Sequence, residues 1–488
     1  MQTDNVSSEG FKRELKLLDA TMIVVGSMIG SGIFIVSADI ARTVGGGGFL
    51  LLTWLIAGVI TIVGALSYGE LAGMFPRAGG QYLYLRESFN PFVAFLYGWT
   101  FFAVIQTGTI AAVGVAFAKY TAVLVPSLGG TMVHLGVMRV TGAQGIAIAS
   151  ILILTFVSTR GIRGGKIVQD VFTIAKLLAL TGVILIGVFV GRNAAAISAN
   201  LATFWTASWT HVAGGRIISI DSLGGVGVAA AFGAAMVGAL FSSDAWNNIT
   251  FTAAEVVEPK RTIPLSLIMG TGIVTLLYIV ANIAYLMILP LQGSPDALDA
   301  AGRGIQFAAE DRVATAAASH IFGDTASLVM AGLIMVSTFG CNNGLILAGA
   351  RVYYAMAKDG LFFRSAGSLN RNAVPSVALW VQAVWAGGLC LSGTYSDLLD
   401  YVVFAVLVFY ILTVWGIIRL RRMRPQAERP YRVWGYPVVP VLYIIAAAAI
   451  AIDLLIFKPA YTLPGVGIVL LGIPIYFLWR KWGGAAAS

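Results

Sequence analysis

The chain has 488 residues, of which 58% are hydrophobic and only 11% are charged, and its net charge is +9. Charged residues make up about a quarter of a soluble domain, so this composition excludes a soluble globular protein and indicates an integral membrane protein. The two cysteines, Cys341 and Cys390, both lie in apolar runs, and we expect no disulfide framework.

Windows of ~20 mostly apolar residues, each long enough to cross a bilayer, recur about twelve times along the chain. We therefore predict an all-α integral membrane protein with about 12 transmembrane helices. The first window runs directly into further spans, which argues against a cleaved signal peptide. The predicted spans lie roughly at residues 17–37, 47–74, 90–123, 143–159, 168–191, 226–256, 264–290, 325–357, 374–392, 396–419, 436–457 and 462–480.

Two spans contain small and polar residues at the depth where a membrane helix is normally most apolar. The first span carries the run GSMIGSGIF at residues 26–34, and the sixth carries FSSDAWNN at residues 241–248. Helix breakers persist in hydrocarbon only where the freed backbone groups face protein, water or a ligand. Two such breaks at corresponding positions of two halves are typical of a transporter's binding site. Their spacing predicts a five-plus-five inverted repeat at residues 16–191 and 226–419, followed by two further helices at 436–480.

Basic residues are distributed unevenly between the loops. With the N-terminus on the inner side, the inner segments hold 22 Lys and Arg residues, the outer segments hold 8, and Lys176 lies inside a span. Because positive residues are retained on the cytoplasmic side, we expect both termini to be cytoplasmic. The net positive charge is then a topology signal and does not indicate a nucleic-acid-binding surface.

Four motifs occur in the order in which a known family carries them. The run GELAGMFPRAGGQY at residues 69–82 resembles the end of span two in the amino acid–polyamine–organocation superfamily. The segments at 168–180, 246–264 and 337–344 resemble spans five, six and eight of its L-type amino acid transporter branch. The resemblance covers roughly residues 16–420. It implies a LeuT-like inverted-repeat fold and a sodium-independent amino acid exchanger or uptake system.

An amino acid zwitterion needs compensating groups inside a membrane, and a broken helix provides them without side-chain charge. We expect the substrate carboxylate on the backbone and hydroxyls of residues 30–32, where the second half-helix begins. We expect the ammonium on carbonyls near Ser27, Met28 and Phe241. Close packing of small residues is the alternative explanation of the breaks. The candidate substrate-binding residues are Ser27, Met28, Ile29, Gly30, Ser31, Gly32, Phe241, Ser242, Ser243, Asp244, Trp246 and Asn247.

Two residues of the sixth span are candidates for gating. The resemblance implies that Phe241 is an aromatic lid that closes the pocket toward the outside. Glu255 lies near the predicted cytoplasmic end of the span, where an ion pair would close an inner gate. An ordinary interfacial charge is the alternative for Glu255.

Lys176 is a lone ammonium in the middle of the fifth span, and intramembrane lysines are rare and usually functional. In sodium-coupled relatives of this fold, a sodium ion bridges spans one and eight near this place. The resemblance implies that Lys176 replaces that ion, with its ammonium on carbonyls around Gly30 and on the hydroxyl of Ser337 or Thr338. Snorkelling to the interface is the alternative, but Lys176 is about 15 Å of helix away from Lys166.

Three roles are open to Asp244. The carboxylate can contact a basic substrate side chain or the α-ammonium, cap the half-helix that begins near residue 245, or carry a proton. Many relatives that take neutral substrates carry glycine at the matching place, whereas some that accept cystine and cationic amino acids carry aspartate. Ser243 stands where many eukaryotic members have a bulkier aromatic residue, which predicts a larger pocket.

The leading functional hypothesis is alternating access with exchange of neutral L-amino acids, and cationic ones come second. Proton-coupled uptake, with Lys176 or Asp244 as the titrating group, is the alternative. An intramembrane enzyme would need a nucleophile–base pair or a metal cluster, and the sequence shows neither, so we expect no enzymatic activity, no metal and no cofactor. A channel would need a continuous polar pore.

One departure from the family pattern concerns the partners. Heteromeric members carry a cysteine between spans three and four that binds a glycoprotein, and loop 124–142 contains none. We therefore expect no disulfide-linked heavy chain. The expected partners are amino acid substrates and membrane lipid, and the expected location is the inner (plasma) membrane of a bacterium.

Overall fold

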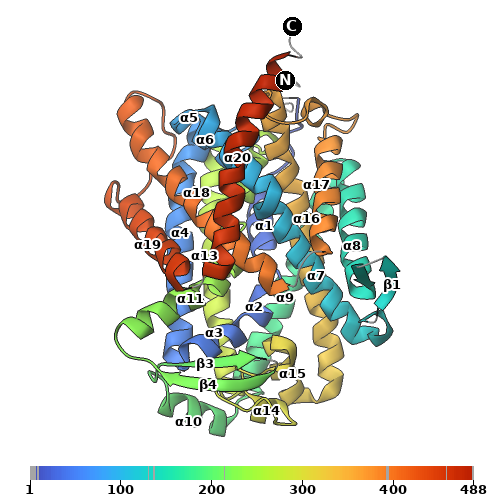
Figure 1. Cartoon of the computed structure of the whole chain (residues 1–488), viewed down its shortest axis with the longest axis vertical. Helices are drawn as coiled ribbons and strands as arrows, with labels where there is room; N and C mark the ends of the chain where they lie inside the picture. Colours follow the sequence, from blue (N-terminus) through green and yellow to red (C-terminus); the bar gives the residue numbers. More distant parts are fainter. Residues whose placement is uncertain are drawn as a thin grey trace.

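A computed structural model describes residue 7 and residues 10–129, 131–135, 138–213, 215–391, 395–457 and 459–485. Long helices run between two ends of the molecule (Figure 1). We call the end that holds the first and last described segments the terminal end, and the opposite one the loop end. Ten helices of the described chain are long and apolar enough to cross a membrane. Two shorter apolar helices occupy the remaining predicted windows, so every predicted span is confirmed as helical.

The helices that correspond to the predicted spans follow in chain order, and two of them are broken. They are α1 (Leu17–Met28) with α2 (Gly32–Ile35) and α3 (Ser37–Val44), α4 (Gly47–Met74), α6 (Pro91–Thr100) with α7 (Gln106–Leu124), α8 (Gly142–Thr159), α9 (Ile162–Phe189), α11 (Val226–Ser242) with α12 (Asn248–Phe251), α13 (Pro259–Ile288), α16 (Asp324–Lys358), α17 (Ser376–Cys390), α18 (Tyr395–Met423), α19 (Val438–Phe457) and α20 (Pro459–Ala485).

Local sequence explains several of the helix starts. Asn90 precedes α6 and accepts a hydrogen bond from the backbone N–H of Val93 at 3.0 Å, while Pro91 occupies the first helical position. Thr141 and Gln144 form a reciprocal capping box at the start of α8. Within the third span, a π-helical turn at Phe101–Ile105 joins α6 to α7, and such turns occur frequently at functional sites.

The loop end holds the structure's departures from an all-helical chain. Two antiparallel hairpins, β1 (Thr131–Leu135) with β2 (Met138–Thr141) and β3 (Ser208–Ala213) with β4 (Arg216–Ser222), were not expected from the sequence. Three short helices lie there as well, namely α10 (Ala194–Ala202), α14 (Ala300–Arg303) and α15 (Val313–Phe322) (Figure 1). The side chain of Asn200 joins these loops to α13, because it bonds the carbonyls of Leu286 at 2.7 Å and Leu289 at 3.0 Å.

Glycines bring the membrane helices into close contact. A Cβ atom added to Gly270 of α13 would lie 2.4 Å from the side chain of Val24 in α1. One added to Gly58 of α4 would lie 2.2 Å from Thr275 in α13. Because lipid supplies little hydrophobic force between helices, such close packing holds the bundle together. It places the break after α1 among α9, α13 and α16.

Candidate transport site

The first break separates α1 from α2 in the buried interior. Helix α1 ends at Met28, Ile29 leaves helical geometry at φ −77° and ψ 92°, and α2 begins at Gly32 after Ser31. Ser31 does not cap α2 with its side chain, and the first N–H groups of a helix have no acceptor in a preceding turn. That a substrate carboxylate binds the N–H groups at the start of α2 stays a prediction.

Lys176 of α9 reaches into this break. Its fully buried ammonium donates to the carbonyls of Gly26 at 2.6 Å, Ile29 at 2.8 Å and Ser337 at 3.2 Å. The contact to carbonyls at the break is the predicted one, but the partner on α16 is the Ser337 carbonyl and not a hydroxyl. The Ser337 hydroxyl bonds the carbonyl of Gly30 at 3.1 Å. The Thr338 hydroxyl bonds carbonyls of its own helix and does not take part.

The other carbonyls of the first break also have protein partners. The Cys341 thiol lies 3.0 Å from the Ser27 carbonyl. The Tyr278 hydroxyl lies 3.0 Å from the carbonyl of Met28 and 3.0 Å from that of Ser242, so it bridges the two breaks. The carbonyls that we expect to meet a substrate ammonium are thus engaged in this conformation. Sequence reasoning missed Tyr278 and Cys341, which lie in apolar runs without a local signal.

The second break separates α11 from α12. Helix α11 ends at Ser242, and the N–H of Asp244 turns back to the Phe241 carbonyl at 3.1 Å. Ala245 has φ +63°, a left-handed conformation that is unusual for a residue with a side chain. Helix α12 begins at Asn248 with Asn247 at its N-cap, so Asp244 is not the cap of this half-helix.

The two breaks touch each other. A Cβ atom added to Gly32 would lie 2.1 Å from the hydroxyl and 3.1 Å from the Cα of Ser242. Trp246 packs edge-on against Tyr68, with ring centroids 4.8 Å apart, and also contacts Tyr410. These ring contacts tie the second break to α4 and α18.

Asp244 borders two small cavities of about 20 Å³ each. One is flanked by Phe241, Ser243 and Trp246, and the other has a mixed lining in which Gln106 and Asn247 are polar. A cavity of this size holds about one water molecule, so an amino acid requires the site to open. The Tyr410 hydroxyl donates to the Asp244 carboxylate at 2.6 Å.

Asn247 connects the second break to the terminal end. Its amide donates to the Gln81 side chain at 3.1 Å, and Gln81 in turn donates to the Thr413 hydroxyl at 3.1 Å. Gln81 belongs to the GGQY motif at the start of α5 (Gln81–Ser88). The motif indicated the family but did not reveal this contact.

Comparison with known proteins decides the family. The family model described as amino acid permease matches residues 15–476. The chain belongs to the amino acid permease family. It is 29% identical to the Asc-type amino acid transporter 1 of Homo sapiens over 476 residues, which cover 96% of this chain and 83% of that protein.

Two further relatives match most of this permease. It is 28% identical to the b(0,+)-type amino acid transporter 1 of Homo sapiens over 486 residues, covering 98% of this chain and 90% of that protein. It is 29% identical to the large neutral amino acids transporter small subunit 2 of Rattus norvegicus over 476 residues, covering 96% and 81%. The permease is an integral membrane protein that transports amino acids, and its family consists of transporters, not enzymes.

A buried ion pair closes the permease on the terminal side of the site. The Arg351 guanidinium of α16 donates to the Glu255 carboxylate at 2.8 Å, and both side chains are almost completely buried. The Glu255 carbonyl also accepts from the N–H groups of Glu14 and Leu15 at 3.0 Å. Glu255 thus ties the segment before α1 to α16, and its role in gating stays a prediction.

A second closure lies at the loop end. Arg42 of α3 donates to the Asp311 carboxylate at 2.6 Å and to the Gln306 carbonyl at 2.6 Å. Lys119 of α7 donates to the Glu310 carbonyl at 2.8 Å. Glu310 and Asp311 have φ +51° and +61°, so two cations hold a turn in left-handed geometry. The sequence alone did not identify this contact.

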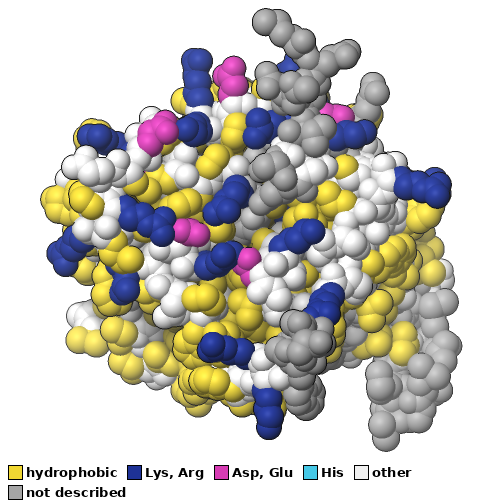
Figure 2. Space-filling model, turned by 90° about the horizontal axis from the view of Figure 1, so that it is seen from above, with side chains coloured by type: hydrophobic (Ala, Val, Ile, Leu, Met, Phe, Trp, Pro, Cys, Tyr) yellow, Lys and Arg dark blue, Asp and Glu magenta, His cyan; other side chains and the backbone are white. Residues whose placement is uncertain are grey.

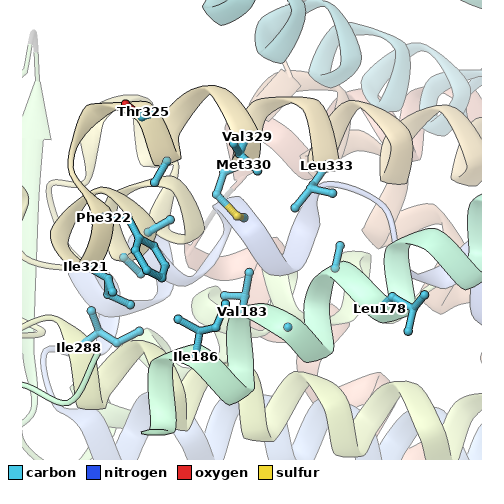
Figure 3. A pocket seen from close by; sticks show the side chains of 15 residues that line it. Leu178, Val183, Ile186, Ile288, Ile321, Phe322, Thr325, Val329, Met330 and Leu333 are labelled. Atoms are coloured by element: carbon cyan, nitrogen blue, oxygen red, sulfur yellow. The ribbon is translucent and has the colours of Figure 1, made fainter. Parts of the chain in front are cut away.

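One apolar groove of the permease differs from the transport site in its lining. It has a volume of about 520 Å³ and lies between α9, α15 and α16. Leu178 and Val183 on one side face Met330 and Leu333 on the other (Figure 3). Such a lining offers nothing to a zwitterion, because charged groups need compensating partners in an apolar environment.

Proposed function

We propose that the permease is a sodium-independent exchanger of L-amino acids that works by alternating access. The observation that carries the proposal is the Lys176 ammonium, which bonds carbonyls of the first break and of α16. A fixed cation at this place links the two helices that a sodium ion would otherwise link. Transport then has no need of a sodium gradient.

The proposed substrates are neutral amino acids first and cationic ones second. A neutral zwitterion needs only the backbone groups of the two breaks, which carry no net charge. Asp244 adds a carboxylate at the second break, next to a small cavity, where it would attract a basic side chain. The relatives include one named for large neutral amino acids and one named b(0,+)-type.

Proton-coupled uptake is the second candidate function. It is favoured by the presence of two ionisable side chains, Lys176 and Asp244, next to the breaks. Either group would change its charge during a cycle in which the site opens to opposite sides.

We further propose the placement of the permease in its membrane. Lys and Arg side chains gather on the terminal end (Figure 2), which is the pattern of a cytoplasmic face. Both termini would then be cytoplasmic, and the loop end would lie outside a bacterial plasma membrane. The absence of a cysteine in loop 124–142 supports transport without a disulfide-linked heavy chain. The two breaks support inverted repeats at residues 16–191 and 226–419.

Uptake of labelled amino acids into purified proteoliposomes tests these proposals. Vesicles that are empty or loaded with unlabelled amino acid are compared without sodium. Uptake confined to loaded vesicles supports exchange, whereas uptake into empty vesicles under an imposed proton gradient supports the second candidate. Absence of transport in both conditions would reject amino acid transport under the proposed mechanism.

The role of Asp244 is tested with two variants in the same assay. Asp244→Asn keeps an acceptor for Tyr410 and removes the charge, and Asp244→Gly removes the side chain. We expect both variants to lower arginine uptake about tenfold more than leucine uptake. This difference corresponds to the free energy of one lost charge-assisted hydrogen bond. Asp296→Asn, at an exposed position of the loop end, is the charge-matched control. Unchanged arginine and leucine uptake in Asp244→Gly would reject a substrate contact.

A further inference from the structure

A pocket of about 410 Å³ opens at the terminal end, away from the transport site. It lies between α5 and the last turn of α16. Tyr82 and Tyr354 are buried and form its aromatic part, and charged side chains from both helices and from the turn before α5 surround them. Such a concave site with aromatic and charged groups differs from a flat surface of solvated charges.

The single carboxylate of this pocket is already neutralised. The Asp359 side chain accepts from the Arg86 guanidinium with one oxygen and from the Tyr82 hydroxyl at 2.8 Å with the other. Burial and the nearby Asp359 charge raise the pKa of Tyr82 above its ordinary value, so its hydroxyl remains a donor. Asp359 is thus not available to neutralise the other cations of the pocket.

Two cations of the pocket remain in excess. Arg77 has only a 3.7 Å contact to Glu87, which Arg424 binds more closely at 3.0 Å. Lys358 lies 5.4 Å above the ring of Tyr354 and has no carboxylate within 4.0 Å among the residues that the structure describes. The lining therefore carries three basic side chains against one acidic side chain, a surplus of two positive charges.

We propose that this pocket binds a phosphate-bearing anion, supplied either by a lipid head group or by soluble phosphate. An arginine binds phosphate through two parallel N–H donors, and a lysine adds a compact charge. The surrounding face is rich in basic side chains (Figure 2), which raises the local concentration of anions. In the proposed orientation, the pocket lies on the side where anionic lipid head groups would meet it.

The position of the pocket connects this anion to the terminal side, where the Glu255–Arg351 ion pair lies. Tyr354 packs edge-on against Phe11, with ring centroids 5.0 Å apart. Phe11 belongs to the segment that leads to Leu15 and its hydrogen bond with Glu255. A phosphate held by Arg77 and Lys358 would link the loop after α4 to α16 beside this segment. The bound anion is therefore expected to stabilise the closed terminal side.

Binding to the full-length, delipidated protein in detergent tests the proposal. The probes are short-chain phosphatidylglycerol, phosphatidylcholine of the same chain length, and inorganic phosphate, and the readout is the shift in melting temperature with probe concentration. The pocket variant is Arg77→Gln with Lys358→Gln. The control is Arg371→Gln with Arg422→Gln, which removes the same charge from exposed positions at the same end.

We expect phosphatidylglycerol to stabilise the protein and phosphatidylcholine not to do so. The pocket variant should bind phosphatidylglycerol about tenfold or more weakly, because each basic residue near an anionic group contributes a few-fold to affinity. The control should bind as the unmodified protein does. A response to inorganic phosphate that the pocket variant loses would support the site and identify a soluble source.

Equal weakening in both double variants would overturn the proposal, because it would show a general effect of surface charge. A failure of phosphatidylglycerol and phosphate to stabilise the unmodified protein would overturn it as well. If the double variant does not fold, Lys358→Gln alone is measured against Arg422→Gln, and the same comparison decides. Transport activity does not enter this test, so its outcome is independent of the proposed exchange.

Discussion

At the scale of single residues, Lys176 determines the state of the first break. Its ammonium donates to the carbonyls of Gly26 and Ile29 at a fully buried position. Replacement by Met keeps the length of the side chain and removes every donor. Each unsatisfied buried carbonyl costs about 1–3 kcal/mol, so the two half-helices would lose their relative position.

We therefore expect Lys176→Met to lower the initial rate of amino acid exchange by at least about tenfold, since 1.4 kcal/mol already corresponds to one decade. The rate is measured in proteoliposomes at equal protein content. Lys260→Met is the matched control, because Lys260 forms an exposed ion pair with Glu428 that contributes little. Exchange by Lys176→Met at the unmodified rate would contradict the role assigned to the ammonium.

At the scale of helical elements, the contact between the two breaks depends on Gly32. A Cβ atom at this position would lie 2.1 Å from the Ser242 hydroxyl and 3.1 Å from the Ser242 backbone. The hydroxyl can rotate away, but the backbone of the second break cannot shift without moving α11. The chain offers a matched control in Gly332 of α16, where an added Cβ atom meets nothing within 4 Å.

We expect Gly32→Ala to abolish most transport and to lower the melting temperature. Gly332→Ala should leave transport unchanged and stabilise its helix by roughly 0.5–1 kcal/mol, because alanine loses less backbone entropy than glycine. Thermal melting in detergent and exchange in proteoliposomes are measured for both variants. If the two variants behave alike, transport and stability do not depend on the close approach of the two breaks.

The same elements show how far the sequence predicts this structure. The breaks after residues 28 and 242 were predicted because glycine, serine and aspartate are conspicuous among membrane-spanning residues. Tyr278, which bridges the breaks, was missed because a tyrosine in an apolar helix carries no signal of its long-range partners. The hairpins at the loop end were missed because short strands in polar loops lack a clear periodicity.

The contacts of the candidate site were likewise predicted only in part. The family resemblance predicted that Lys176 contacts carbonyls at the first break, and its unusual position in a span indicated only that it is functional. Its partner on α16 is a carbonyl of Ser337 instead of a hydroxyl, which depends on the rotation of a helix that no sequence pattern specifies. The sequence predicted an ion pair for Glu255 without naming its partner, and only the packed structure identifies Arg351.

At the scale of the whole molecule, two closures stand on either side of one small site. The Glu255–Arg351 pair closes the terminal side, and the Arg42–Asp311 pair holds the strained turn at the loop end. Alternating access requires that one closure opens while the other stays closed. Weakening each closure separately should then expose the site to opposite sides of the membrane.

The reporter for this exposure is a cysteine in place of the buried Ser243, which lines a cavity next to Asp244. The native Cys341 lies at the first break and is as buried as Ser243, at 3%, so the protein without the reporter is labelled in parallel to give the background. A membrane-impermeant thiol reagent is added on one side or the other of vesicles of defined orientation. The labelling rate then reports how often the site opens to that side.

In this reporter background, Arg42→Ala should raise the labelling rate from the loop end about fivefold or more. The substitution removes a partly buried ion pair. The turn that this pair holds can then relax, and each of its left-handed residues carries a conformational strain of about 1–3 kcal/mol. Asp296→Asn is the control, because it removes an exposed charge of the loop end that does not pair with Arg42. Glu255→Gln should instead raise labelling from the terminal end, since it leaves the Arg351 charge buried without a partner. Faster labelling from the same side in both variants would show that the two closures do not belong to opposite gates.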